Sequence, residues 1–272
     1  MLIDGFESSR LDADDRGLAY GDGLFETLAL SEGRVLALDR HLERLARGAE
    51  RLGLAPPPDP VLREEIDSVC RGHTRGVLKI ILTRGSGGRG YRWPNVQRER
   101  RIVSLYEWPR ALDAPPQRGA FLCRHPLSIN PAIAGIKHLN RLDQVLASRA
   151  WPQGDYVEGL MLDGDGHVIE GTRSNLFLVL GRRLITPCLE RAGVAGIVRA
   201  AVIERAARLR LEVIVKSVLV EDLLVADELF VTNSIIGVHS IDRLDADRPM
   251  IYRAHAVAEE LVQLLRHDEL IP

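Results

Sequence analysis

Hydrophobic residues in the first 110 positions change spacing several times, and each change marks a different predicted element. LFETLAL (24–30) and RVLAL (34–38) flank a short turn and predict a β-hairpin. The apolar residues that follow recur three and four positions apart, which predicts a helix capped by Asp39 and ended by Gly53. The other predicted elements of this half are a helix over 61–71 and strands over 77–83 and 101–108.

The second half begins after a proline-containing stretch that has no apolar periodicity. Residues 111–119 are interpreted as a linker, so we predict an N-terminal domain of 1–110 and a C-terminal domain of 120–272. The clearest pattern is a hairpin over 156–171 that turns at 163–166. Further predicted elements are a strand near 121–129, helical spacing over 139–146, a hairpin over 175–187, a helix over 194–211, strands over 213–218 and 228–233, and helices near 221–225 and 253–266. The pattern predicts a two-domain α/β or α+β fold.

Composition narrows the class of protein. Hydrophobic residues make up 46% and charged residues 27%, which is ordinary for a globular chain, and a formal net charge of −2 argues against nucleic acid as the main partner. Cys70, Cys123 and Cys188 lie far apart without metal-ligand spacing, so we expect three free thiols and no metal site. The amino terminus lacks the apolar segment of a signal peptide, and no stretch reaches the ~18 apolar residues of a membrane span. We therefore expect a cytoplasmic protein without a membrane partner.

Lys137 is a candidate nucleophile because of the residues that precede it. It follows the apolar, small-residue segment 131–136 and lies at the start of a predicted helix. Partial desolvation and the positive end of a helix both favour the neutral amine that Schiff-base chemistry requires. A solvated surface lysine is the ordinary alternative on these residues alone.

Glu170 and the segment 193–199 suggest sites for a charged ring and an anion. Glu170 ends a hairpin strand, either as a carboxylate in water or as the partner that keeps a pyridine nitrogen protonated. Gly193 and Gly196 flank a helix start, where the N–H groups of Ile197 and Val198 can point at an anion. Short polar residues after the strand near 228–231, namely Thr232, Asn233 and Ser234, are further candidate donors. Arg44 lies off the apolar stripe of its helix, which indicates a solvated charge.

The loop RGSGGRGY (84–91) combines four glycines with Arg84 and Arg89. Flexible backbone beside two guanidinium groups suits a lid that binds carboxylates. A nucleotide-phosphate loop is excluded, because the GK[ST] ending and the following helix are missing. A plain hairpin tip is the alternative.

Seven motifs follow one another along the chain: DDRGLAYGDGLFET (14–27), HLERL (41–45), VLKIILTRGSGGRGY (77–91), AGIKHLNRL (134–142), VIEGTRSNLF (168–177), GVAGIVR (193–199) and VTNS (231–234). This series resembles the fold-type IV enzymes that depend on pyridoxal 5′-phosphate (PLP), a group that includes branched-chain and D-amino-acid aminotransferases and aminodeoxychorismate lyases. The resemblance covers most of the chain, from about residue 2 to about residue 240. Within the group, GIKHLNRL and RGSGGRGY resemble the lyases most closely.

The resemblance implies a fold, a cofactor and a role for each candidate residue. The implied fold is a small N-terminal α/β domain and a larger C-terminal pseudo-barrel domain that binds PLP. Lys137 matches the Schiff-base lysine, Glu170 the partner of the pyridine nitrogen, and Arg44 a phosphate-binding arginine, against the surface interpretation above. The other implied site residues are Ile197, Val198, Thr232 and Asn233 around the phosphate, and Arg84, Arg89 and Tyr91 on the substrate side. The implied assembly is a homodimer whose 84–91 loops reach the neighbouring active site.

Three functions remain open on the sequence. The first is a lyase that converts 4-amino-4-deoxychorismate to 4-aminobenzoate and pyruvate on the way to folate, in which Lys137 moves protons. The second is a PLP-dependent aminotransferase for a branched-chain or D-amino acid. The third is a non-enzymatic module that binds an anion through the glycine-rich loop and the helix start at Gly196. The residues of 84–91 and 137–142 favour the lyase over the aminotransferase.

Overall fold

The computed structural model describes residues 1–87, 89–114, 116 and 118–272. The chain divides into two compact units, which are Met1–Pro109 with Ile136–Asn140, and Arg110–Gly135 with Arg141–Pro272. Gly88 of the predicted lid, and Pro115 and Gln117 of the predicted linker, lie outside the described residues. The predicted C-terminal domain of 120–272 differs at residues 136–140, which cluster with the first unit instead.

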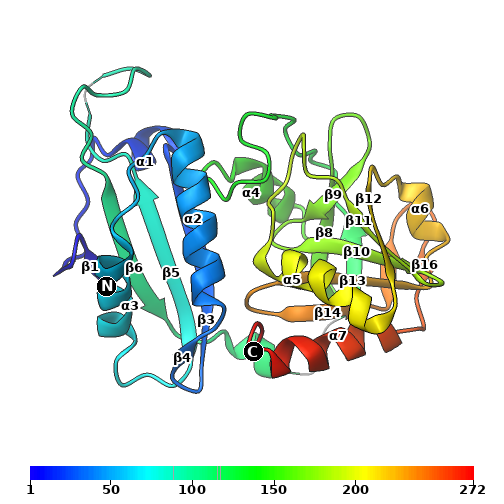
Figure 1. Ribbon diagram of the computed structural model, residues 1–272. Coiled ribbons are helices and arrows are strands. Elements are labelled where there is room, and N and C mark those ends of the chain that lie inside the picture. The colour runs from blue at the N-terminus through cyan, green and yellow to red at the C-terminus, as the bar shows by residue number, and fades with distance from the viewer. Residues whose placement is uncertain (88, 115, 117) are drawn as a thin grey trace. The chain divides into compact units, whose positions relative to one another are not determined.

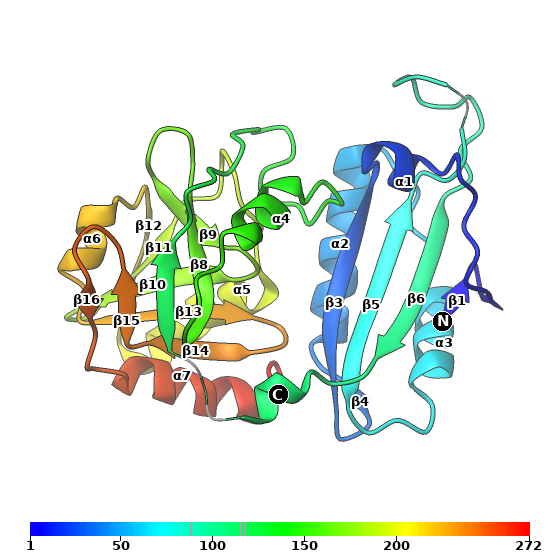
Figure 2. The same ribbon diagram turned by 180° about the vertical axis from the view of Figure 1, so that it is seen from behind.

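The first unit is built on a six-stranded antiparallel sheet of order β2-β1-β6-β5-β3-β4. Its strands are β1 (Leu2–Ile3), β2 (Phe6–Glu7), β3 (Gly23–Ser31), β4 (Arg34–Val35), β5 (Gly76–Thr83) and β6 (Arg100–Tyr106), and its helices are α1 (Arg16–Tyr20), α2 (Leu38–Leu52) and α3 (Asp59–Cys70). Helices α2 and α3 lie on one face of the sheet (Figure 1), and the view from behind shows the strands in front of both helices (Figure 2).

Alternation along β3 separates the two faces of this sheet. Leu24 and Leu28 are 2% and 0% exposed on the face that packs against the helices, where Leu24 touches Gly48 of α2. Phe25 and Thr27 point to the opposite face and are half-buried. The helix-covered face is therefore the core of the unit, and the other face carries the mixed apolar and polar side chains.

The boundaries of α2 correct one prediction. The helix begins at Leu38, and its capping residue is Ala37 in the left-handed conformation, not Asp39. Asp39 lies in the first turn, where a carboxylate interacts favourably with the exposed N–H groups, and it also accepts a hydrogen bond from Arg63. The end at Gly53 is confirmed, because this residue adopts the left-handed conformation that suits glycine after a helix.

The second unit contains two five-stranded sheets, of orders β12-β11-β10-β13-β14 and β16-β15-β7-β8-β9. The strands are β7 (Gly119–Leu122), β8 (Tyr156–Leu162), β9 (Val168–Gly171), β10 (Asn175–Leu180), β11 (Arg183–Pro187), β12 (Glu212–Lys216), β13 (Glu228–Asn233), β14 (Gly237–Ile241), β15 (Arg243–Asp245) and β16 (Met250–Ile251). The predicted hairpins over 156–171 and 175–187 are confirmed as the antiparallel pairs β8–β9 and β10–β11. The mixed α/β class predicted from the sequence is confirmed.

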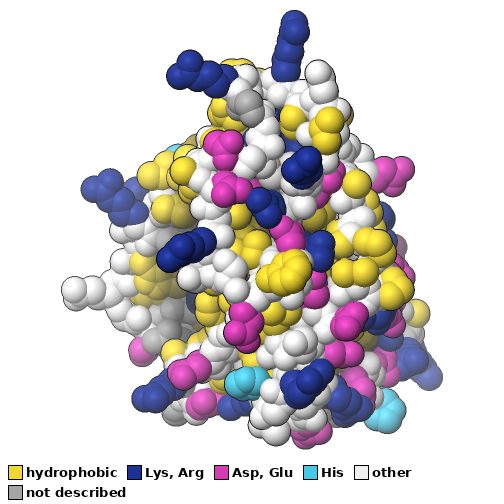
Figure 3. Space-filling view, turned by 90° about the vertical axis from the view of Figure 1, so that its left-hand side faces the viewer, with side chains coloured by type: hydrophobic (Ala, Val, Ile, Leu, Met, Phe, Trp, Pro, Cys, Tyr) yellow, Lys and Arg dark blue, Asp and Glu magenta, His cyan; other side chains and the backbone are white. Residues whose placement is uncertain are grey.

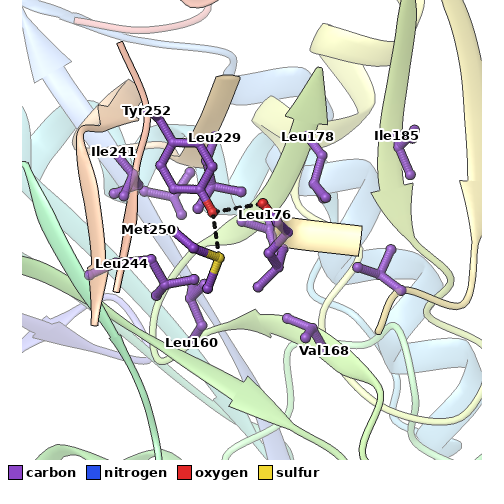
Figure 4. Packing of buried hydrophobic residues seen from close by; sticks show 14 of the residues in the cluster. Leu160, Val168, Leu176, Leu178, Ile185, Leu229, Ile241, Leu244, Met250 and Tyr252 are labelled. Carbon is purple, nitrogen blue, oxygen red and sulfur yellow. Dashed lines mark hydrogen bonds between the residues drawn. The ribbon is translucent and has the colours of Figure 1, made fainter. Parts of the chain in front are cut away.

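Side chains of both sheets meet in one apolar core, which Figure 4 shows around Tyr252. Leu160 of β8 and Leu229 of β13 are fully buried in it. The Tyr252 hydroxyl donates to the Leu223 carbonyl oxygen at 3.0 Å, so the one polar group of this ring is satisfied. The core thus fixes the two sheets of this unit against each other.

Helices cover the outer face of the β10–β13 sheet. The helices of this unit are α4 (Leu142–Arg149), α5 (Ile197–Arg205), α6 (Val220–Leu224) and α7 (Ala256–His267), with the 3-10 helices η1 (Arg110–Asp113) and η2 (Ala206–Leu209). Both α5 and α7 pack on β13 (Figure 1). The α5 helix is shorter than the predicted 194–211, because residues 193–195 instead pair with Gly135 in a turn.

Three remaining expectations concern thiols, membranes and surface charge. Cys70, Cys123 and Cys188 are free thiols, as predicted. Within the described residues, no helix has the length and apolar character to cross a membrane. Basic and acidic side chains are intermixed on the face shown in Figure 3, without a tract of one sign.

Candidate active site

Lys137 lies in an extended segment and not at the start of a helix, so that part of its prediction is wrong. The segment pairs with β3: the Phe25 N–H donates to the Lys137 carbonyl oxygen, and the Leu139 N–H donates to that of Gly23, at 3.0 and 2.9 Å. Helix α4 begins only at Leu142. Pairing with β3 therefore fixes the Lys137 backbone, and Lys137 does not begin a helix.

The Lys137 side chain shares an aromatic ring with a second lysine. Its Nζ lies 4.3 Å from the centre of the Phe25 ring, and Lys79 Nζ lies 5.5 Å from the same centre. Lys79 is opposite Thr27 in the β3–β5 register, so these side chains share the sheet face that the helices leave uncovered. This face brings together two amines, a hydroxyl and an aromatic ring.

Arg44 is held by a buried carboxylate that the sequence interpretation did not identify. Glu26 is 1% exposed and accepts hydrogen bonds from Arg44 Nε at 2.8 Å and from Arg44 Nη2 at 2.5 Å, and its Oε2 lies 2.6 Å from His41 Nδ1. Arg44 is itself buried, which overturns its interpretation as a solvated charge. Side chains alternate between the two faces of β3, and this places Glu26 on the face toward α2. The alternation was the sequence signal that could have identified Glu26 as a buried residue.

Burial and charge in this cluster set the protonation of Glu26 and His41. Burial disfavours the Glu26 carboxylate, but the charge of Arg44 and the hydrogen bonds outweigh it and lower the pKa to about 2. Burial, with smaller contributions from Arg44 and Lys137, lowers the pKa of His41. Glu26 is therefore ionised and His41 neutral near pH 7, and Glu26 orients the Arg44 guanidinium.

The Glu26 cluster gives a prediction for acid stability. Because the folded-state pKa lies below the unfolded value of about 4.5, the stabilisation is present above that pH and disappears as the pH falls toward 2. Between pH 5 and pH 3 this group alone is expected to cost the wild type about 2 kcal/mol of unfolding free energy. Denaturant unfolding of wild type and Glu26→Gln at both pH values measures the difference. Equal pH slopes for the two proteins would contradict the assignment.

Glu170 is a buried carboxylate, 4% exposed, so the alternative of a strand-end charge in water is wrong. Its Oε2 accepts a hydrogen bond from the Val194 N–H at 2.8 Å. Burial lowers the pKa of both Arg141 and Arg199, and the negative charge of Glu170 partly offsets this in each case. The Glu170 carboxylate thus interacts electrostatically with the guanidinium groups of Arg141 and Arg199.

The segment before α5 has the features of an anion site. Gly193 has a φ of +89°, and Gly196 is the capping residue of α5, which no side chain caps within the described chain. The first two helical residues, Ile197 and Val198, are buried. On β13, Thr232 is 1% exposed and its Oγ1 has no hydrogen-bond partner among the described residues. A buried hydroxyl without a partner is costly, which indicates a ligand acceptor nearby.

The Asn233 side chain forms hydrogen bonds with main-chain groups. Its Oδ1 accepts hydrogen bonds from the N–H groups of Ile235 and Ile236, at 2.8 and 2.9 Å, and its Nδ2 donates to the Arg173 carbonyl oxygen at 3.2 Å. The Asn233 side chain therefore closes the turn between β13 and β14.

Arg84, a predicted substrate-binding residue, is engaged by side chains and main-chain groups of its own unit. The side chain is 1% exposed, and its five N–H donors are engaged by Asp22, Gly53, Leu52 and Gln97 at 2.6–3.0 Å. Its guanidinium also stacks on Trp93, 4.4 Å from the ring centre. Arg84 consequently holds the base of the loop in place.

Hydrogen bonds to the main chain hold the tip of the same loop, while the side chains of Arg89 and Tyr91 are exposed to solvent. Arg16, which pairs with Asp22 at 2.9 Å, donates to the carbonyl oxygens of Gly90 and Tyr91 at 2.9 and 3.3 Å. Tyr91 is 86% exposed, and Arg89 is exposed as well. These two predicted substrate-side residues therefore remain available, and the loop that carries them is anchored at several points.

Comparisons with known proteins agree on one family. The family model for class IV amino-transferases matches residues 23–244. The aminodeoxychorismate lyase of Vibrio harveyi is 34% identical over 90% of this chain and 91% of that protein. The crystal structure of 4-amino-4-deoxychorismate lyase from Pseudomonas aeruginosa aligns over 99% of both chains with 41% identity and a TM-score of 0.90. The D-alanine aminotransferase of Bacillus licheniformis is 26% identical over 85% of this chain and 83% of that protein.

Proposed function

Because the chain belongs to the class IV amino-transferase family, we propose that it is the lyase that splits 4-amino-4-deoxychorismate into 4-aminobenzoate and pyruvate. The full-length match to the Pseudomonas aeruginosa lyase at 41% identity carries this proposal, since the aminotransferase similarity is lower. The motifs around Lys137 and in the loop 84–91 favour the same choice. The reaction belongs to the carbon–oxygen lyases.

The residues of the site fit PLP. Lys137 is an amine on a fixed backbone, Glu170 is a buried carboxylate suited to a protonated ring nitrogen, and Thr232 has a buried hydroxyl without a partner in the described chain. The N–H groups of Ile197 and Val198 begin an uncapped helix, which suits a phosphate. When bound, PLP supplies an electron sink for the carbon that loses a proton. Arg44, oriented by Glu26, supplies a further positive charge for the phosphate.

Lys137 carries the proton transfers of the proposed reaction. Its neutral amine removes the proton from the ring carbon that bears the amino group, and the C–O bond to the enolpyruvyl group then breaks as the ring becomes aromatic. The protonated Lys137 returns this proton to the methylene carbon of the departing group, which gives pyruvate. General acid–base catalysis of this kind contributes ~10²–10⁴-fold. With PLP bound, the Glu170 carboxylate would keep the pyridine nitrogen protonated.

The loop 84–91 is assigned to the substrate through Arg89 and Tyr91, since Arg84 is engaged within its own unit. Both side chains are exposed, and Trp93 and Val96, which follow them in the sequence, are 57% and 69% exposed. Exposed apolar residues grouped in this way are typical of an interaction surface. We include a homodimer in the proposal, in which this loop serves the partner's active site.

A product assay tests the function. Purified protein incubated with 4-amino-4-deoxychorismate and PLP, without any keto acid, is expected to release 4-aminobenzoate and pyruvate in equal amounts. The same preparation is expected to have the mass of two chains by light scattering. Activity that requires 2-oxoglutarate would establish the aminotransferase instead, and a protein that binds no PLP would favour the non-enzymatic module.

A further inference from the structure

Val194, in the turn that precedes α5, is held by two buried side chains. Its N–H donates to Glu170 Oε2, and its carbonyl oxygen accepts a hydrogen bond from Asn175 Nδ2, each at 2.8 Å. Glu170 and Asn175 are 4% and 5% exposed, so water competes little for either bond. With main-chain groups fixed on both sides, the turn has one position relative to the Glu170 carboxylate.

The same asparagine also touches the residue that starts α5. A Cβ atom built on Gly196 would overlap Asn175 Oδ1. Gly196 has φ −68° and ψ 144°, a conformation that any residue adopts, so the glycine is required for space and not for backbone geometry. The Asn175 amide thus packs directly against the beginning of the helix whose N–H groups form the anion site.

Asn175 stands on a rigid base. It is the first residue of β10 and lies opposite Thr232 of β13, so the two side chains share one face of the sheet. The turn that leads from Glu170 to Asn175 is held by Glu158, which is fully buried and accepts hydrogen bonds from Thr172 Oγ1 and Ser174 Oγ at 2.6 Å each. The hydrogen bonds to Glu158 consequently fix the spacing of Glu170 and Asn175.

We propose that Asn175 is a positioning residue that keeps the two ends of the cofactor site, Glu170 and the start of α5, in register. The proposal rests on the proposed function, because it concerns the same cofactor site. Asparagine suits the role because a short side chain must donate to the Val194 carbonyl and leave room for Gly196. Aspartate would place a negative charge against that carbonyl and beside a phosphate, and alanine would leave the carbonyl unpaired.

Binding measured on cofactor-free protein tests this role. Asn175→Ala is expected to weaken PLP binding by about 10-fold or more, to weaken inorganic phosphate similarly, and to weaken pyridoxal, which has no phosphate, much less. Asn130→Ala is the matched control, since Asn130 is an exposed asparagine of the same unit whose side chain also bonds the main chain, by accepting a hydrogen bond from the Ala132 N–H. If the alanine variant does not fold, Asn175→Ser, which is shorter than asparagine and adds no charge, is measured in its place.

A double-mutant cycle with Gly196→Ala sharpens the test. The added methyl group is expected to weaken PLP binding in the wild type, and to do so less in the Asn175→Ala background, where the overlapping amide is gone. Dissociation constants of Asn175→Ala within twofold of wild type for both PLP and phosphate, or strictly additive effects, would overturn the proposal. The product assay on wild type is independent of this cycle, so a failure of the lyase function is seen separately.

Discussion

Replacing Lys137 by alanine is expected to lower the release of 4-aminobenzoate and pyruvate by at least ~10³-fold. The variant loses the amine that takes the proton from the substrate and returns it to the leaving group. Its backbone is expected to keep its place, because the hydrogen bonds between this segment and β3 involve only main-chain atoms. Steady-state rates with aminodeoxychorismate measure the loss, and added methylamine is expected to restore part of the activity.

A matched control for this variant comes from the lysine content of the chain. Only three of its 36 basic residues are lysines, namely Lys79, Lys137 and Lys216. Lys216 forms an ion pair with Asp222 at 2.7 Å in the second unit and is partly exposed. Lys216→Ala is expected to keep the wild-type rate. A Lys137→Ala protein that retains more than a tenth of that rate would exclude Lys137 as the proton carrier.

Replacing Glu170 by glutamine is expected to reduce kcat by ~10²–10³-fold, the range seen when one preorganised electrostatic partner is removed. A glutamine oxygen still accepts the Val194 N–H, so the turn before α5 is expected to stay in place. The amide, however, has no negative charge to keep a proton at the pyridine nitrogen. The variant is therefore expected to bind PLP with affinity near that of the wild type and to fail mainly in turnover.

Glu228 offers the corresponding control among buried carboxylates. It is 4% exposed, like Glu170, and accepts hydrogen bonds from Val257 and Ala258 at the start of α7, at 3.0 and 3.2 Å. Glu228→Gln keeps only one of the two acceptor oxygens, so its stability is expected to fall, but it lies outside the proposed site and its kcat is expected to be unchanged. A Glu170→Gln enzyme whose kcat is within threefold of wild type would show that the Glu170 charge is not used.

Local patterns in the chain predicted elements well wherever the signal was a period or a turn. The hairpin over 156–171 follows from alternating apolar residues around a glycine-containing turn, and both its strands and its turn occur as predicted. The end of α2 at Gly53 follows from glycine's ease in the left-handed conformation. The predicted helix starts at Asp39 and Lys137 were wrong. Contacts with residues distant in the sequence decide where these helices begin.

Some residues of the candidate site were likewise identified from the sequence, and others only from the structure. The motif order along the chain led to Lys137 and Glu170, and both lie within the residues that the family model matches. It led equally to Arg84 and Asn233, whose side chains the structure uses to hold a loop and a turn. Glu26 and Asn175 lie within two of these motifs, but the motifs assigned no role to either, because neither residue type is unusual and each acts only through partners brought to it by folding.

Lys137 shows what the sequence determines and what the tertiary structure determines. The sequence by itself determined the residue types, their order and the family, because these depend only on which side chains follow one another. The tertiary structure decided that Lys137 is fixed by pairing with β3 and not by a helix, that Glu26 orients Arg44, and that Asp22 and main-chain groups engage Arg84. The physical reason is that hydrogen bonding and burial depend on distances between residues far apart in the chain, and no local period records them.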